Sequence, residues 1–159
     1  MKILGIDPGS LATGYGLIET GYARPEVIDC GVIAPDPDKS LPERLLEIYR
    51  ELITVIKRHS PDELAVENLF YGANVKSLTV IAQVRGVILL ASATCGIPVA
   101  EYSPREVKMS VVGRGGASKE QVRNMVAATA IMGEELKSLD AADGIAVALC
   151  HHGRKVQAI

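Results

Sequence analysis

Short hydrophobic runs and amphipathic stretches follow one another along this chain of 159 residues. Three of the runs, over residues 2–7, 14–18 and 27–33, lie near the start and are joined by short segments containing glycine or proline. This spacing predicts three β-strands in an antiparallel meander. The first run is almost continuously apolar, which predicts a strand buried on both of its faces.

Helical periodicity begins after residue 40. Ser40 is followed three residues later by Glu43, which is the pattern of a capping box at a helix N-terminus. Apolar residues then recur at helical spacing: Leu45, Tyr49, Leu52, Ile53 and Ile56. We expect this helix to end at the Ser-Pro-Asp segment 60–62, before a fourth strand over 64–67 and a loop over 68–74.

A second long helix and a fifth strand are expected next. The helix covers 75–94, and Gly96 can adopt the left-handed conformation that ends it. The strand covers 97–102, and Pro98 favours a position at the edge of a sheet because proline has no N–H to donate.

Three further helices are predicted in the last third of the chain. Ser103 and Ser118 each begin a capping box, and the glycine-rich segment 113–116 separates the two helices that they start. A final helix begins near Ser138 or Asp140 and carries its apolar residues at helical spacing.

The order of these elements is three strands, a helix, a strand, a helix, a strand and then helices. It predicts an α/β fold with a mixed five-stranded sheet, in which the meander is followed by two parallel strands reached through helical crossovers. A chain of this length fits one domain, residues 1–159, and shows no linker or internal repeat.

Composition narrows the class of protein without naming it. Hydrophobic residues make up 48% and charged residues 23%, as in an ordinary globular protein. The net charge of −2 weighs mildly against a nucleic-acid binder, although a local basic patch could be offset by an acidic site. The apolar run 84–93 is too short to span a membrane, and we see no signal peptide, so we expect a cytoplasmic protein. Its three scattered cysteines predict free thiols.

Four acidic residues carry the candidate chemistry. Asp7 and Glu67 each end an apolar strand, and Asp140 and Asp143 lie three residues apart at the start of the last helix. Strand ends in open α/β sheets border the functional crevice. Because clustered carboxylates repel one another, such a group requires a cation, and oxygen ligands suit Mg²⁺ or Mn²⁺. We therefore predict a metal site for phosphoryl chemistry.

Each acidic residue also has a purely structural interpretation. Asp7 precedes Pro-Gly-Ser and could cap a turn, whereas Glu67 could face solvent at a strand end. Asp140 and Asp143 could complement the dipole of their helix. Likewise, the adjacent His151 and His152 are most simply explained as surface residues or dipole partners near a helix C-terminus.

The chain resembles the RuvC family of Holliday junction endonucleases in five blocks that occur in the family's order. The blocks are IDPGSLATGYG (6–16), AVENLF (65–70), QVRGV (83–87), VKMSVVG (107–113) and DAADGIA (140–146). The resemblance covers nearly the whole chain and implies a ribonuclease-H-like fold. It also implies a homodimer, partnership with the RuvA–RuvB branch-migration complex, and nicking of two opposed strands of a four-way DNA junction. The nicking would depend on two Mg²⁺ ions, or Mn²⁺ in their place, and leave 5′-phosphate and 3′-hydroxyl ends.

The family's functional residues map onto matching positions. Its catalytic carboxylates correspond to Asp7, Glu67, Asp140 and Asp143, its two basic residues to Lys108 and Lys119, and its loop aromatic to Phe70. Beside Phe70, Tyr71 could stack on an unpaired base or merely anchor the loop. Arg114, among glycines, is a further candidate for phosphate contact.

Two departures from the family pattern are visible. Family members often carry a longer basic C-terminal tail, and some have histidine at the position of Asp140. We expect the dimer face on the long helix around Leu78, Ala82 and Gly86. The alternative function is a non-catalytic module that binds branched DNA. A nucleotide-binding fold of the actin type would need two such domains, so we set it aside.

Overall fold

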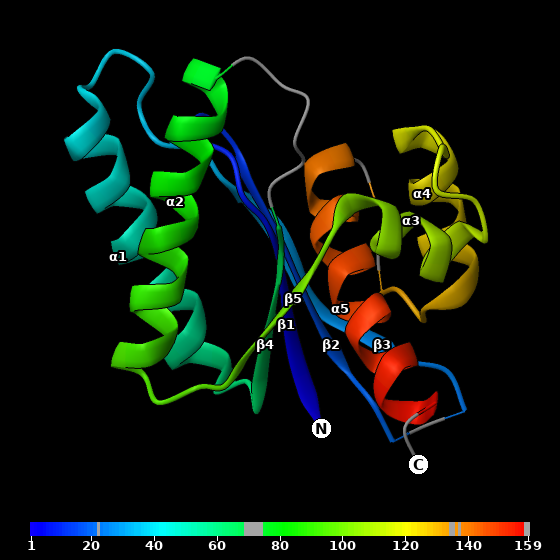
Figure 1. The fold of residues 1–159 in the computed structure, drawn as a ribbon. Coiled ribbons are helices and arrows are strands. Elements are labelled where there is room, and N and C mark those ends of the chain that lie inside the picture. Colours follow the sequence, from blue (N-terminus) through cyan, green and yellow to red (C-terminus); the bar gives the residue numbers. More distant parts are fainter. Residues whose placement is uncertain (22, 69–74, 134–135, 137, 158–159) are drawn as a thin grey trace.

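The computed structural model describes residues 1–21, 23–68, 75–133, 136 and 138–157. Within this part of the chain, five strands form one sheet in the order β3-β2-β1-β4-β5 (Figure 1). The strands are β1 (Lys2–Asp7), β2 (Thr13–Glu19), β3 (Glu26–Ile33), β4 (Glu63–Glu67) and β5 (Val99–Tyr102). β1, β2 and β3 pair antiparallel, whereas β4 runs parallel to both β1 and β5. The predicted mixed sheet is confirmed.

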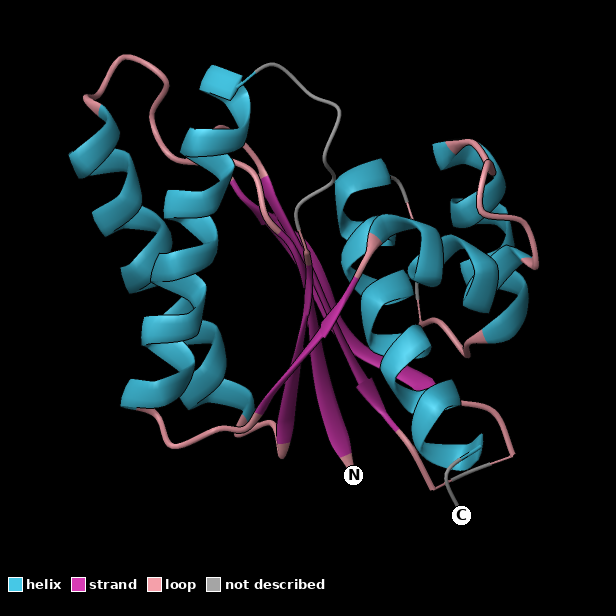
Figure 2. Ribbon diagram, viewed as in Figure 1, coloured by secondary structure: helices cyan, strands magenta, loops and turns pink. Residues whose placement is uncertain are grey.

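Helices cover both faces of the sheet (Figures 1 and 2). On one face lie α1 (Leu41–His59) and α2 (Val75–Thr94); on the other lie α3 (Pro104–Val112), α4 (Lys119–Thr129) and α5 (Leu139–Gln157). Successive residues of a strand place their side chains alternately in the α1–α2 layer and in the α3–α5 layer, because side chains alternate between the two faces of a sheet. Leu4 and Ile6 pack with α1 and α2, whereas Ile3 packs with α5.

Local signals placed the element ends well. The capping boxes at Ser40, Ser103 and Ser118 are all present, and Gly96 has the predicted positive φ of 69°. The fifth strand is an edge strand, as predicted, but it begins two residues later than expected. Ile97 is instead tied to the end of α2, since its N–H donates to the carbonyl of Ser92 and its carbonyl accepts from the Ser92 hydroxyl.

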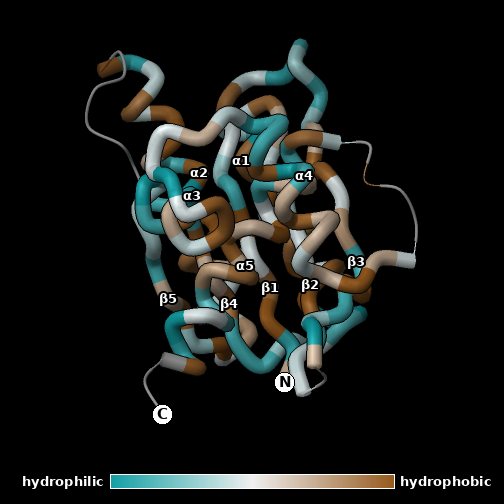
Figure 3. The backbone as a smooth tube through the Cα atoms, turned by 90° about the vertical axis from the view of Figure 1, so that its right-hand side faces the viewer, coloured by the Kyte–Doolittle hydropathy of each residue, from teal (hydrophilic) through white to brown (hydrophobic). Residues whose placement is uncertain are grey.

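Glycines let α5 lie directly on the sheet, and α5 crosses in front of the central strands in Figure 3. A Cβ atom added at Gly14 would collide with the backbone of Asp140, and one added at Gly5 would collide with the backbone of Gly144. This close approach of backbones brings the first turn of α5 over the carboxyl end of β1.

The helix α2 has a largely uncovered surface. It is long and apolar enough, by length and composition alone, to cross a membrane, although only 22% of the tested window is buried. The run 84–93 is only part of this helix, which contains the charged residues Lys76 and Arg85 and continues through serine, threonine and glycine residues. One face, with Val84, Ile88 and Ala91, is fully buried against the core.

Candidate active site

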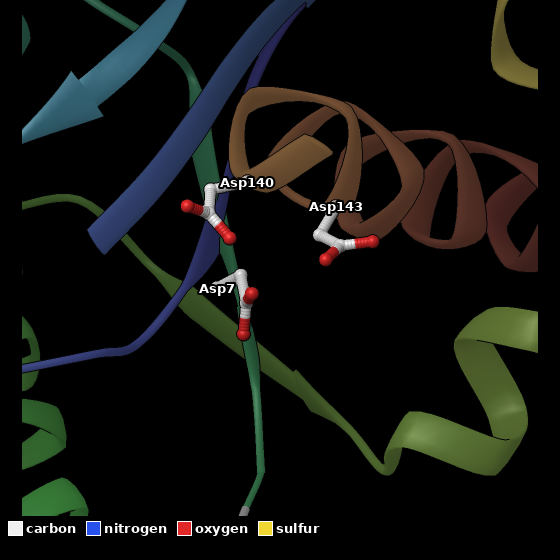
Figure 4. A group of neighbouring side chains, drawn as sticks. All are labelled: Asp7, Asp140 and Asp143. Carbon is white, nitrogen blue, oxygen red and sulfur yellow. The ribbon is translucent and has the colours of Figure 1, made fainter. Parts of the chain in front are cut away.

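Three aspartates meet where β1 ends and α5 begins. One carboxylate oxygen from each of Asp7, Asp140 and Asp143 lies within 4.8 Å of the other two. Figure 4 shows the three side chains directed toward a common space, one from the strand and two from the first turns of the helix. Asp140 and Asp143 share a helix face because they are three residues apart.

Glu67 reaches the same place from the neighbouring strand. β1 and β4 are parallel, and Ile6 pairs with Val66. The next residues, Asp7 and Glu67, therefore lie side by side at the carboxyl ends of the two strands. The Glu67 side chain forms a hydrogen bond with Asp7. All four predicted carboxylates therefore converge. The three aspartates bring their oxygens within 4.8 Å of one another, and Glu67 joins them through its hydrogen bond with Asp7.

Burial and mutual repulsion make the carboxylates hard to ionise together. Burial, followed by the negative charge of Asp143, raises the pKa of Asp7 to about 6. Burial and the charge of Asp7 raise the pKa of Glu67 to about 8. At neutral pH without metal, Glu67 is thus protonated, and its O–H group donates a hydrogen bond to the Asp7 carboxylate.

A lysine ammonium group lies against the aspartates. Nζ of Lys119 is 2.7 Å from Oδ2 of Asp143 and 3.3 Å from Oδ1 of Asp140. Partial burial opposes the charge of Lys119, but the hydrogen bond and charge of Asp143, with Asp7 and Asp140, outweigh it and raise the pKa. The site thus favours a cation, and its oxygen-only donor set fits Mg²⁺ or Mn²⁺.

The other basic candidates lie beside this cluster. Lys108, on α3, is close enough to Glu67 for its charge to favour the ionised carboxylate. Lys108 also lines a cavity of about 510 Å³ with Arg105, Gly115 and Gly116. Arg114 is exposed in the loop that follows α3. Phe70 and Tyr71 lie outside the described residues, so their proposed contacts stay predictions.

The surface role expected for His151 is wrong. His151 is only 5% exposed, and its ring is hydrogen-bonded to Tyr102 and to Glu63. Helical periodicity could have indicated its burial. His151 follows Asp140 by eleven residues, which is close to three full turns, so it lies on nearly the same face of α5 as this predicted site residue. His152, by contrast, is half-buried, and burial lowers its pKa.

A mixed sheet of this order, with carboxylates from β1, β4 and the last helix at one edge, defines a ribonuclease-H-like fold. The family model described as crossover junction endodeoxyribonuclease RuvC matches residues 3–151. The chain belongs to the RuvC family.

Known proteins of this family match over nearly the full chain. The crossover junction endodeoxyribonuclease RuvC of Syntrophomonas wolfei is 48% identical over 151 residues, which cover 95% of this chain and 88% of that relative. The Thermus thermophilus RuvC, solved in complex with a Holliday junction substrate, has a TM-score of 0.91 and 29% identity. That match covers 99% of this chain and 96% of the other. The yeast mitochondrial Holliday junction resolvase Ydc2, at 14% identity and a TM-score of 0.70, covers 98% and 80% and shares the fold.

Proposed function

We propose that this chain is a cytoplasmic Holliday junction resolvase, whose single nuclease domain, residues 1–159, nicks two opposed strands of a four-way DNA junction. The observation that carries the proposal is the convergence of Asp7, Glu67, Asp140 and Asp143 at one edge of the sheet in a member of the RuvC family. Family membership supports the substrate, and the site supports hydrolysis of a phosphodiester bond.

The four carboxylates would hold the divalent metal. Two Mg²⁺ ions, or Mn²⁺ in their place, would supply an activated water and stabilise the leaving 3′-oxygen, leaving a 5′-phosphate and a 3′-hydroxyl. Asp7 lies between the α5 aspartates and Glu67, so we assign it the shared ligand position. Lys119 and Lys108 flank the cluster and would balance the charge of the scissile phosphate.

The basic residues beside the cluster would contact the DNA backbone. Lys108, Arg114 and Lys119 belong to the α3–α4 layer next to the carboxylates, and Arg105 lines the same cavity as Lys108. Phe70 and Tyr71 would stack on unpaired bases at the junction centre.

Replacing Lys108 by alanine should weaken junction binding and reduce its dependence on salt. The slope of log K against log [salt] is negative, and loss of one phosphate contact reduces its magnitude by about 0.9. Binding of a labelled junction in EDTA at several salt concentrations measures this slope. Lys57→Ala, which removes an equal charge from α1 on the other face of the sheet, is the control. Equal slopes for the two variants would contradict the contact.

We also propose a homodimer through α2, and partnership with RuvA–RuvB by family membership. Ala82 and Gly86 are exposed, Leu78 is half-buried, and Leu90 is 59% exposed farther along α2. The exposed residues from Ser77 to Thr94 are uncharged, so covering them requires little desolvation of charge. A twofold dimer would place one site on each of two opposed strands of the junction.

Gly86→Arg should convert the dimer to a monomer. A Cβ atom added at Gly86 meets nothing within 4 Å beyond the adjacent backbone of α2, and the position is exposed, so the change should leave the fold intact while placing a charge in the interface. Light scattering should then give the mass of one chain, 16.9 kDa, and coordinated nicking of both strands should be lost. Thr54→Arg, on the exposed surface of α1, should leave the mass unchanged. A Gly86→Arg protein with the mass of the unaltered protein would exclude this face.

Cleavage of a mobile four-way junction, compared with linear duplex and with and without Mg²⁺, tests the function itself. Paired nicks confined to the junction and dependent on the metal are expected. Tight junction binding without cutting in Mg²⁺ or Mn²⁺ would favour the alternative, a non-catalytic module that binds branched DNA.

A further inference from the structure

A second polar cluster lies along the same contact between α5 and the sheet, and it extends from Tyr102, the strand partner of Glu67, toward the start of β4. Nε2 of His151 is 2.5 Å from a carboxylate oxygen of Glu63, and the Tyr102 hydroxyl is 2.7 Å from Nδ1 of His151. The Lys155 ammonium donates to the second oxygen of Glu63. We call these four residues the Glu63–His151 network.

Every polar group of this network has a partner. With its proton on Nε2, His151 donates to the Glu63 carboxylate and accepts from the Tyr102 hydroxyl. Lys155 balances the charge of Glu63. Burial opposes ionisation of Glu63, but the hydrogen bonds from Lys155 and His151 outweigh it and hold its pKa below the usual range. A network whose members are all hydrogen-bonded, with His151 buried within it, is directional and fixes the elements that it joins.

The distance between the network and the carboxylate site is nearly the same along β4 as along α5. Glu63 and Glu67 lie four residues apart on the same face of β4, which is about 13 Å at the rise of a strand. Asp143 and His151 lie eight residues apart on α5, which is about 12 Å at the rise of a helix. Once His151 meets Glu63, Asp143 is therefore carried to the level of Glu67.

The rest of the contact between α5 and the sheet lies on β1 and β2. An added Cβ atom at Gly5, Gly14 or Gly16 would collide with Gly144, Asp140 or Ile145, so this contact holds the first turns of α5 close to the two strands. The Glu63–His151 network adds a polar connection from the later turns of α5 to β4 and β5, which this contact does not reach. At the carboxylate end, repulsion among Asp7, Asp140 and Asp143 opposes close docking when no metal is bound.

We propose that Glu63, Tyr102 and His151 are positioning residues, which hold α5 in the register on β4 and β5 that presents Asp143 to Asp7 and Glu67. The assignment rests on the proposed metal-dependent function of that site. Buried polar groups such as His151 are a weak source of net stability but can select one arrangement among several. The network should thus act on metal affinity beyond its effect on overall stability.

The test is a Mn²⁺ titration of the thermal unfolding of full-length protein, together with single-turnover cleavage of a junction. His151→Ala should raise the Mn²⁺ concentration for half-maximal stabilisation by about 10- to 100-fold, the range found when groups that orient metal ligands are removed. Metal-free junction affinity should change less than twofold. His151→Gln, whose amide can still donate to Glu63, should restore part of the Mn²⁺ affinity. Tyr102→Phe, which removes one hydroxyl and retains the ring, should give a smaller shift in the same direction.

A control of matched stability separates positioning from general loosening. Leu52→Ala leaves a cavity in the core of the opposite layer and lowers the unfolding temperature without touching α5. If Leu52→Ala shifts the Mn²⁺ midpoint as far as His151→Ala, or if neither network variant shifts it, the proposal is overturned. Unaltered protein that binds Mn²⁺ yet never cuts a junction would refute the proposed function alone, since the titration needs no cleavage.

Discussion

Asp7→Asn is expected to abolish junction cleavage while junction binding persists. Asp7 is the acidic residue placed against both the α5 aspartates and Glu67, so its loss removes the shared ligand of the proposed metal site. We expect single-turnover cleavage in Mg²⁺ to fall by roughly 1,000-fold or more, which corresponds to about 4 kcal/mol in the barrier. Binding should hold or tighten, because removal of a negative charge reduces repulsion of the DNA phosphates.

The control for this change is Asp38→Asn, which removes the same charge from an exposed loop residue before α1. It should cut at the rate of the unaltered protein. Should Asp7→Asn retain cleavage within tenfold of that rate, the carboxylate would not be a required metal ligand and the active-site assignment would fail.

Metal-free protein is expected to lose stability as the pH rises from about 4 to about 8. The pKa values of Asp7 and Glu67 lie near 6 and 8 in the folded protein, above their ordinary values of 3.8 and 4.5. The folded state therefore binds more protons than the unfolded state in this window, and stability falls with pH, by a few kcal/mol. Lys119, whose pKa is also raised, contributes a stability that is lost only at strongly alkaline pH. Urea unfolding in EDTA at a series of pH values measures the effect.

Mg²⁺ should reverse this loss, and most strongly at pH 8, because it binds only the folded carboxylates. Asp7→Asn should stabilise metal-free protein at pH 8 by about 1–3 kcal/mol, since it removes a buried charge, and should abolish the response to Mg²⁺. A flat pH profile in EDTA, or an Asp7→Asn protein that is less stable than the unaltered one at pH 8, would contradict the repulsion inferred for this cluster.

Much of the fold could be predicted because its signals are local. Capping boxes act within four residues, and Ser40, Ser103 and Ser118 therefore marked their helices correctly. Alternation and continuity of apolar residues likewise identified each of the five strands found among the described residues. The start of β5 was misplaced because the hydrogen bonds between Ile97 and Ser92 join the strand's flank to the end of α2, and no periodicity reports such a contact.

The carboxylates of the site could be named in advance, but their assembly could not be derived from spacing alone. Asp7 and Glu67 end strands that turn out to be parallel neighbours, a pairing that the order of elements suggested. The approach of Asp140 depends on glycines in β1 and β2 that leave room for a helix backbone. The pattern predicted for His151 failed because adjacent histidines near a helix end look like surface residues until the partner strand is known.

The sequence by itself determined where helices and strands form and which acidic residues stand at their ends, since backbone preference, capping and periodicity act over a few neighbouring residues. Only the tertiary structure decided that α5 lies directly on the sheet, that Lys119 meets the aspartates and that His151 is buried against Glu63. Those arrangements depend on which surfaces fit together across the chain, and on the desolvation and repulsion of charges that become close only once the chain is folded.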